Sequence, residues 1–277
     1  MKLLYLGTAA AEAMPAVFCN CAVCMRARKE KGKNIRARSQ MLIDEEMLVD
    51  FGPDAYLNAV RFGVDLSAVK HLLITHSHID HFLPFEFYYR SKGCAENMRE
   101  EKMNVYGNAA VKEKLSLYMQ GQDLAAYGVE FVQIKPFERL QIGAYAVTAL
   151  PAKHIHTEDA FVFLIEKEEK VLLYCNDTGV LGEDTLAYLE KRNKTLQCIS
   201  FDCTYATVEA GRWQGHMSLE DNALLFDEMK KRGIADAATQ VVCTHFSHWN
   251  MRMHDEMQTL ADKYGFTIAY DGMIKKL

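Results

Sequence analysis

The sequence has neither a surplus of positive charge nor a long hydrophobic run. Its 277 residues include 32 Lys and Arg against 37 Asp and Glu, which gives a formal net charge of −5. Proteins that bind nucleic acids usually carry a basic surplus, so this balance disfavours nucleic acid as a partner. No apolar run approaches the roughly 18–20 residues that a membrane-spanning helix needs, so we expect no membrane segment.

The sequence also lacks a low-complexity linker, a short-period repeat and a convincing leader. The N-terminal stretch MKLLYLGTAAAEA contains a lysine and an A-x-A motif, but its apolar core is shorter than the roughly 7–15 residues of a secretory leader. We interpret it as a first β-strand that ends at Gly7-Thr8, and we expect a cytoplasmic protein. In that reducing environment, a tight cluster among the eight cysteines is more readily explained by metal binding than by disulfides.

Short apolar runs alternate with helical patterns from one end of the chain to the other. A hairpin with an acidic turn is predicted over residues 41–51. Helices are predicted from Pro53 to about Gly63, from the capping-box variant at Ser218–Asp221 to Gly233, and over His254–Tyr264; strands are predicted over 69–75, Tyr145–Leu150, Phe161–Ile165, Val171–Cys175, Cys198–Phe201, Val241–Thr244 and Thr267–Tyr270. This interleaving predicts an α/β fold, and we expect a single domain over residues 1–277.

The most distinctive segment is THSHIDH, residues 75–81, which follows one of these strands. In an extended or turning segment, His76 and His78 project to the same side, whereas Asp80 and His81 come after the chain has turned. Imidazole nitrogens and carboxylate oxygens bind Zn²⁺ or Mn²⁺ at about 2.0–2.2 Å. Two ligand pairs in one loop favour two adjacent metal ions, and the alternative is a chance cluster on a surface loop.

The motif His76-x-His78-x-Asp80-His81 after a strand resembles the signature of the metallo-β-lactamase fold. The later ligand positions of that family follow in order, with His154 in LPAKH, Asp177 in NDTG and His245 in TH. The resemblance implies an αββα sandwich, in which two mixed sheets pack face to face with helices outside. It also implies that one metal binds His76, His78 and His154, that a second binds Asp80, His81 and His245, and that Asp177 bridges the two.

Two further positions near these ligands are candidates for a role at the site. His156 lies two residues after His154 and is an alternative third ligand, although His154 is nearer the strand end. Asp50, which ends the strand LVD, matches an early aspartate of the family and would orient a ligating histidine; the alternative is a turn aspartate. Histidine at position 78, where an oxygen-reducing branch of the fold has glutamate, favours hydrolysis.

The expected metal pair defines the expected chemistry. Two divalent cations roughly 3.5–4 Å apart share a water and lower its pKa, which generates a bridging hydroxide near neutral pH. Mixed imidazole and carboxylate ligation accommodates Zn²⁺ or Mn²⁺, with Fe²⁺ as a further alternative. Asp80 and Asp177, as ligands of this pair, are therefore also candidate catalytic residues.

A second cluster, Cys19-Asn-Cys21-Ala-Val-Cys24, needs one more ligand to close a tetrahedral zinc site, and His248 offers it. This combination resembles the PhnP-type phosphodiesterases, which cleave phosphoribosyl 1,2-cyclic phosphate. The resemblance implies a structural Zn²⁺ on a zinc-knuckle insertion near residues 15–38. It also implies that His216, in Gly215-His-Met-Ser218, contacts the phosphate and protonates the leaving oxygen; the alternative is a residue that merely flanks a helix cap.

The leading hypothesis is therefore a dinuclear-metal hydrolase, a phosphodiesterase acting on a small anionic cyclic phosphate ester. The alternatives are an RNA 3′-processing nuclease of the same fold, a thioester or lactone hydrolase, and a non-catalytic metal-stapled ligand-binding module. The basic run over residues 26–38 could bind phosphate or RNA, or be a solvated face. The aromatic stretch within residues 82–103 could line a pocket or simply pack in the core, and a homo-oligomer is compatible with the sequence.

Overall fold

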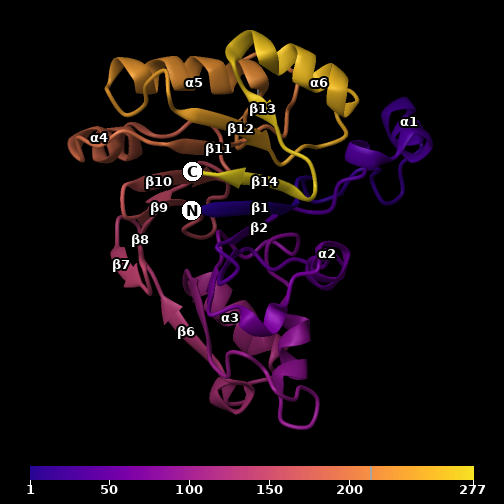
Figure 1. Ribbon diagram of the computed structural model, residues 1–277, viewed down its shortest axis with the longest axis vertical. Coiled ribbons are helices and arrows are strands. Elements are labelled where there is room, and N and C mark those ends of the chain that lie inside the picture. Colours follow the sequence, from indigo (N-terminus) through magenta and orange to yellow (C-terminus); the bar gives the residue numbers. More distant parts are fainter. Residues whose placement is uncertain (213) are drawn as a thin grey trace.

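The computed structural model describes residues 1–212 and 214–277 and has two seven-stranded mixed β-sheets with helices on their outer faces (Figure 1). The first sheet has the order β14-β1-β2-β3-β4-β5-β6, and the second has the order β13-β12-β11-β10-β9-β8-β7. The two chain ends lie side by side because the last strand pairs antiparallel with the first. This architecture confirms the predicted αββα sandwich.

Neighbouring strands of each sheet are mostly consecutive in the chain, and among the described strands only the pair of β14 with β1 joins strands that lie far apart in the sequence. The first sheet contains β1 (Lys2–Gly7), β2 (Gln40–Ile43), β3 (Met47–Val49), β4 (His71–Leu73), β5 (Met103–Gly107), β6 (Val129–Gln133) and β14 (Met273–Lys276). The second contains β7 (Arg139–Ile142), β8 (Tyr145–Pro151), β9 (Phe161–Lys167), β10 (Lys170–Cys175), β11 (Cys198–Asp202), β12 (Gln240–Thr244) and β13 (Thr267–Ile268).

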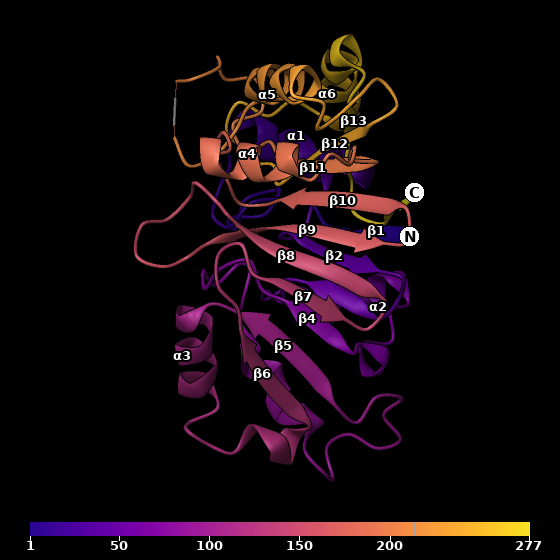
Figure 2. The ribbon, with the colours of Figure 1, turned by 90° about the vertical axis from the view of Figure 1, so that its left-hand side faces the viewer.

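The helices form the two outer layers. The α-helices are α1 (Ala22–Glu30), α2 (Ala55–Phe62), α3 (Ala109–Tyr118), α4 (Glu183–Lys191), α5 (Leu219–Lys231) and α6 (His254–Ala261). Short 3₁₀ turns occur at η1 (Gly32–Asn34), η2 (Leu66–Ala68), η3 (Pro84–Arg90), η4 (Leu124–Tyr127) and η5 (Asp262–Tyr264). Figures 1 and 2 show α4, α5 and α6 over the second sheet and α2 and α3 beside the first. None of the described helices combines the length and apolar character needed to cross a membrane.

The hydrophobic core has three parts, as a four-layer sandwich requires. Side chains from the inner faces of both sheets, such as Tyr5, Phe163 and Tyr174, form the central part. A second part lies between the second sheet and its helices, and a third lies between the first sheet and its helices. Burial of apolar surface on both faces of each sheet therefore holds the strand ends in fixed relative positions.

Most predicted elements occur, with shifted ends. The strand predicted over 69–75 is hydrogen-bonded as a strand only over His71–Leu73, because the chain beyond it turns into the histidine loop. The strand predicted over Thr267–Tyr270 stops at Ile268. The capping box at Ser218 forms with Asp221, and Gly233 adopts a φ of +69° after the end of α5, as expected for a helix stop.

The sequence did not predict β5, β6, β7, β14, α1, α3 or α4. The edge strands β6, β7 and β14 carry partly exposed polar residues on one face, so they lack the continuous apolar run that marks a buried strand. β14 pairs with β1 at the other end of the chain and β6 pairs with β5 across α3, so these two pairings are not local in the sequence, whereas β7 forms a short hairpin with β8.

The aromatic stretch after the histidine loop forms the 3₁₀ turn η3. Phe87 is buried against Phe51 and Phe82, which agrees with a packing role. Phe87 and Tyr89 also line a largely apolar cavity of about 450 Å³ that includes Leu48 and Met103. None of the predicted metal ligands lines this cavity, so it is separate from the histidine cluster.

Candidate metal centres

The predicted metal ligands follow strand ends that meet at one edge of the sandwich. His76, His78, Asp80 and His81 come after β4 of the first sheet. His154 follows β8, Asp177 follows β10 and His245 follows β12, all in the second sheet. Strands β10, β11 and β12 are parallel, so their carboxyl ends lie at the same edge. Each candidate metal centre therefore draws ligands from both sheets.

The structure brings three histidines together into a first group, with ring nitrogens of His76, His78 and His154 within 4.8 Å of one another. His154 Nε2 lies 3.3 Å from His78 Nδ1 and 3.7 Å from Asp177 Oδ2. The buried His76 Nε2 has no hydrogen-bond partner among the described residues, and it lies 4.0 Å from Asp177 Oδ2. A buried nitrogen left unsatisfied in this way is costly unless a ligand occupies the space in front of it.

A second group consists of Asp80, His81, Asp177 and His245, all of them buried. From His81 Nε2, the distances are 3.2 Å to Asp80 Oδ2, 3.2 Å to Asp177 Oδ2 and 3.3 Å to His245 Nε2. Two ligands at about 2.0–2.2 Å from a tetrahedral ion are about 3.4 Å apart, so these spacings fit a shared cation. Asp177 has oxygens near both groups, which fits a bridging position.

Hydrogen bonds behind the histidines fix which ring nitrogens face the centre. Asp50 Oδ2 lies 2.7 Å from His81 Nδ1, and Asp50 Oδ1 accepts a hydrogen bond from the Thr75 hydroxyl. With its proton committed to Asp50, that hydroxyl accepts from His76 Nδ1–H at 3.0 Å. When the two rings are neutral, both Nε2 atoms carry lone pairs toward the centre, as metal ligation requires.

The same arrangement occurs on the side of the second sheet. His154 Nδ1 donates to the Gly215 carbonyl at 3.2 Å. The Thr204 hydroxyl donates to the His245 carbonyl at 2.9 Å and accepts from His245 Nδ1–H at 2.8 Å. His245 Nε2 therefore faces Asp177 Oδ1 at 2.8 Å with a lone pair, and two acceptors at that distance need a proton or a cation between them. The residues present thus fit a pair of divalent ions.

The pKa values reflect the same concentration of negative charge. Burial alone would lower the pKa of His81, but the carboxylates of Asp177, Asp80 and Asp50 outweigh it and hold that pKa well above its ordinary value. His76, which has fewer carboxylate neighbours, has a pKa held well below its ordinary value by burial. The site therefore attracts a positive charge at His81, which a proton supplies in the metal-free protein.

His216 lies at the rim of the two groups, with its ring 4.8 Å from that of His154 and 5.7 Å from that of His245. Its Nδ1 lies 2.8 Å from Oδ2 of the buried Asp202, and its side chain is 19% exposed. Burial alone would lower the pKa of His216, but the charge of Asp202 and the hydrogen bond to it raise the pKa to about 9. His216 is therefore a cationic acid at neutral pH that solvent and a ligand can reach.

Sequence reasoning missed Asp202 and Thr204, which orient His216 and His245. Asp202 Oδ1 also accepts from the backbone N–H of Thr204 at 2.9 Å, so the carboxylate has a fixed orientation. The available signal was that Asp202 closes strand β11, in the same way that the ligands follow the ends of β10 and β12. An aspartate at such a strand end indicates a site residue.

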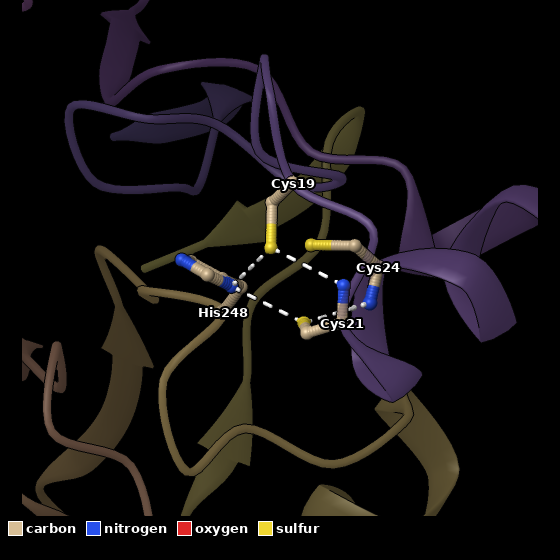
Figure 3. Close-up of side chains that lie close together, drawn as sticks. All are labelled: Cys19, Cys21, Cys24 and His248. Carbon is tan, nitrogen blue, oxygen red and sulfur yellow. Dashed lines mark hydrogen bonds between the residues drawn. The ribbon is translucent and has the colours of Figure 1, made fainter.

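Figure 3 shows the third group, in which Cys19, Cys21, Cys24 and His248 point toward one another. His248 Nδ1 lies 3.6 Å from Cys19 Sγ and 3.5 Å from Cys21 Sγ. A tetrahedral Zn²⁺ with bonds of about 2.3 Å to sulfur and 2.0–2.1 Å to nitrogen sets these atoms about 3.5–3.6 Å apart. The backbone N–H of Cys24 and the neighbouring His248 lower the pKa of Cys21 to about 6, which favours the thiolate that zinc binds.

This group is tied to the second one through a short piece of chain. His245 and His248 are separated by Phe246 and Ser247, and the Phe246 backbone pairs with Thr8 and Ala10 of the N-terminal segment. The buried Arg36 lies over the Phe246 ring, 4.8 Å from its centroid. The loop that carries His245 is therefore held by the same segment that carries the cysteines.

Other candidates from the sequence lie outside these groups. His156 is exposed and, in the part of the chain that the structure describes, belongs to no cluster of candidate ligands. The basic run over residues 26–38 does not form one free cationic face. Arg26 pairs with Glu30 and Glu256, Arg36 is buried, and Arg38 pairs with Asp54.

A profile of the family described as the β-lactamase superfamily domain matches residues 46–246, which is more than half of the chain. The chain therefore belongs to the metallo-β-lactamase superfamily of hydrolases.

The individual proteins to which the chain is similar share little sequence identity with it. The structure is similar to that of a diphosphatase from the PhnP family, with a TM-score of 0.74, 20% sequence identity and coverage of 100% of this chain and 97% of that one. It is also similar to Zn²⁺-bound PqqB from Methylobacterium extorquens, with a TM-score of 0.76, 18% identity and full coverage of both chains. In sequence, ribonuclease Z from Bradyrhizobium diazoefficiens is 22% identical over 141 residues, which span 50% of this chain and only 46% of that protein.

Proposed function

We propose that the protein is a dinuclear-metal phosphodiesterase that hydrolyses a small cyclic phosphate ester. The observation that carries the proposal is the Asp202–His216 pair beside a set of seven convergent metal ligands. The metal ligands by themselves would explain only metal binding. His216 adds a protonated imidazole at the rim of the site, and such an acid is needed when a bound anionic group loses an oxygen that must be protonated as it leaves.

The chain's residues divide into holding and proton-transfer roles. His76, His78 and His154 would hold one divalent ion, Asp80, His81 and His245 the other, and Asp177 both. When bound, such ions supply charge that stabilises phosphoryl oxygens and acidify a water molecule. As water attacks phosphorus and the P–O bond to the leaving oxygen breaks, His216 gives its proton to that oxygen. Asp202 keeps the imidazole oriented and stabilises its charged form.

The similarity to a PhnP-family diphosphatase supports a phosphate substrate, and the cysteine–histidine group supports a structural zinc beside the hydrolytic centre. The net charge of −5 argues against a long polyanion, since like charges repel. A small phosphate ester, whose charge is concentrated at the ligand cluster, avoids that repulsion.

The proposal is tested by assaying the purified protein, loaded with Mn²⁺ or Zn²⁺, against a ribose-based five-membered cyclic phosphate. We expect turnover to a phosphate monoester. We expect His216→Ala to lower the rate by about 10²–10⁴-fold with metal content unchanged, since general acid catalysis contributes about that much. No turnover despite two bound catalytic ions would refute a phosphodiesterase. No turnover in either protein, together with weaker binding of the cyclic ester by His216→Ala, would identify a binding module instead.

An RNA 3′-processing nuclease is the second candidate, and the match to a ribonuclease Z favours it. A precursor RNA with a 3′ extension, incubated under the same conditions, separates the two. Cleavage of that RNA at a rate comparable to that of the cyclic ester would replace the small-substrate proposal.

A further inference from the structure

The peptide unit between His76 and His78 is held by residues outside the ligand set. The Ser77 backbone N–H donates to Glu158 Oε2 at 3.0 Å, and the Ser77 hydroxyl donates to Glu158 Oε1 at 2.6 Å. On the other side, Lys114 Nζ donates to the Ser77 carbonyl at 2.6 Å. Ser77 is thus fixed at its N–H, hydroxyl and carbonyl, which leaves its two histidine neighbours little freedom to move.

Glu158 is itself anchored to a rigid element. Asn108 Nδ2 donates to Glu158 Oε2 at 2.7 Å and to the Asp159 carbonyl at 2.8 Å. Asn108 is buried and caps α3, because its side-chain oxygen accepts from the Val111 N–H at 2.9 Å. The Glu158 carboxylate therefore ties the histidine loop to the N-terminus of α3.

Glu158 also belongs to the loop that carries the third histidine. That loop, residues 152–160, follows the end of β8 at Pro151, contains His154 and is closed by a hydrogen bond from the Ala152 N–H to the Ala160 carbonyl at 2.9 Å. One side chain thus joins the two segments that supply His76, His78 and His154. Among the described residues, Glu158 hydrogen-bonds to none of Asp80, His81 and His245; Asp50 orients His81 and Thr204 orients His245 instead.

We infer that Glu158 is a positioning residue for the three-histidine centre, which it serves by locking Ser77 to the His154 loop and to α3. The inference rests on the dinuclear site proposed above, and it gives the three-histidine centre a support in addition to the Thr75 hydroxyl that orients His76. Partners behind the ligands of a metal site typically alter metal affinity by about 10–100-fold when removed. Because Glu158 acts through the peptide rather than through a ligand ring, we expect the lower end of that range.

The chemistry of the contacts provides a conservative variant. In Glu158→Gln, the amide oxygen accepts from the Ser77 N–H and from Asn108, and the amide nitrogen donates to the Ser77 hydroxyl, which can act as an acceptor. All three hydrogen bonds survive without the negative charge. Glu158→Ala removes all three, and Ser77→Ala removes one while leaving the carboxylate and its other contacts in place.

The test is Mn²⁺ titration, by calorimetry and electron paramagnetic resonance, of protein with Zn²⁺ retained on the cysteine group and the other sites emptied. The Glu158 variants are made in two backgrounds, His245→Ala, which weakens the second centre, and His78→Ala, which weakens the three-histidine centre. We expect Glu158→Ala to weaken Mn²⁺ binding about tenfold in the His245→Ala background and to leave it unchanged in the His78→Ala background. In the His245→Ala background, the Mn²⁺ affinity of Glu158→Gln should stay within about threefold of that of its parent. The affinity of Ser77→Ala should lie between those of Glu158→Gln and Glu158→Ala.

Asp236→Ala is the matched control. Asp236 Oδ1 accepts from two backbone N–H groups, those of Ala238 and Thr239, but it precedes β12 whereas His245 follows that strand. It should lower the melting temperature without changing Mn²⁺ affinity. Equal weakening in both backgrounds, no weakening, or a Gln variant as weak as the Ala variant would overturn the inference. Failure of the unaltered protein to bind two Mn²⁺ ions would instead refute the dinuclear site.

Discussion

Gly52 allows the chain before α2 to pass directly against Asp80, and replacing it tests the geometry of the second centre. The two segments are joined by hydrogen bonds from the Phe51 N–H to the His81 carbonyl and from the Leu83 N–H to the Phe51 carbonyl, both 2.7 Å. A Cβ atom added at Gly52 would lie 1.9 Å from the Asp80 carbonyl oxygen and 2.8 Å from its carbonyl carbon. The neighbouring atoms are backbone, which cannot rotate out of the way.

The size of the required shift follows from that contact. Real Cβ atoms essentially never approach within 3.0 Å of another heavy atom, so Gly52→Ala must separate the segments by at least about 1.1 Å. Metal–ligand distances tolerate about 0.2 Å. Since Asp80 and His81 lie in the displaced segment, we expect the variant to lose the second catalytic ion and nearly all activity. Overpacking should also cost about 1–3 kcal/mol of unfolding free energy.

The measurement is metal content after gel filtration, by inductively coupled plasma mass spectrometry, together with the rate of hydrolysis and a urea melt. Gly63→Ala is the control, because a Cβ there meets nothing within 4 Å and only the φ of +65° is strained. It should lose about 1 kcal/mol of stability and keep its metals and activity. A Gly52→Ala protein with the same metal content and rate as Gly63→Ala would show that the position of Asp80 does not depend on this close approach.

Three further changes probe other parts of the molecule. Asp202→Asn removes the charge that raises the pKa of His216 to about 9, so the alkaline limb of the kcat/KM profile should move about two units lower; an unmoved limb would exclude His216 as the acid. Cys21→Ser should remove the Zn²⁺ of the cysteine group and lower the melting temperature, whereas the exposed Cys94, changed to Ser as control, should alter neither; equal metal content in the two variants would contradict the assigned ligands. Burial and the neighbouring Arg36 lower the pKa of His254 to about 4, so its contribution to stability is complete above pH 6.5 and is lost as the pH falls toward 4. Between pH 6.5 and 4, the free energy of unfolding of the metal-free protein, measured by urea melts, should fall about 1–2 kcal/mol more than that of His254→Asn. Parallel curves of unfolding free energy against pH for the two proteins would refute the pKa shift.

The sequence predicted which side chains cluster as candidate ligands better than it predicted the framework around them. His76, His78, Asp80 and His81 are a local pattern after an apolar strand, and a local pattern is readable without knowledge of the fold. The edge strands β6 and β14 cannot be recognised from a local pattern. β14 pairs with β1, which lies at the other end of the chain, and β6 pairs with β5, which is itself weakly marked in the sequence.

The supporting residues were hidden for the same reason. Glu158 is one acidic residue in a polar loop, and its partner Ser77 is 81 residues away. Asp202 and His216 lie 14 residues apart, and only the packing of β11 against its neighbours sets them at hydrogen-bond distance. Residue type reveals the groups that bind metal, whereas the groups that orient them depend on tertiary contacts.

Because each candidate catalytic metal centre combines side chains from both sheets, binding of its ion would be thermodynamically linked to the cohesion of the sandwich. An ion present at a thousand times its dissociation constant adds about 4 kcal/mol to the free energy of unfolding, a sum comparable to the whole stability of many small proteins. The protein should therefore melt at a temperature that rises with the free metal concentration. Loss of the metal ions would then destabilise the fold as well as abolish hydrolysis. The supply of divalent ions in the cell would therefore also determine how long the folded protein persists.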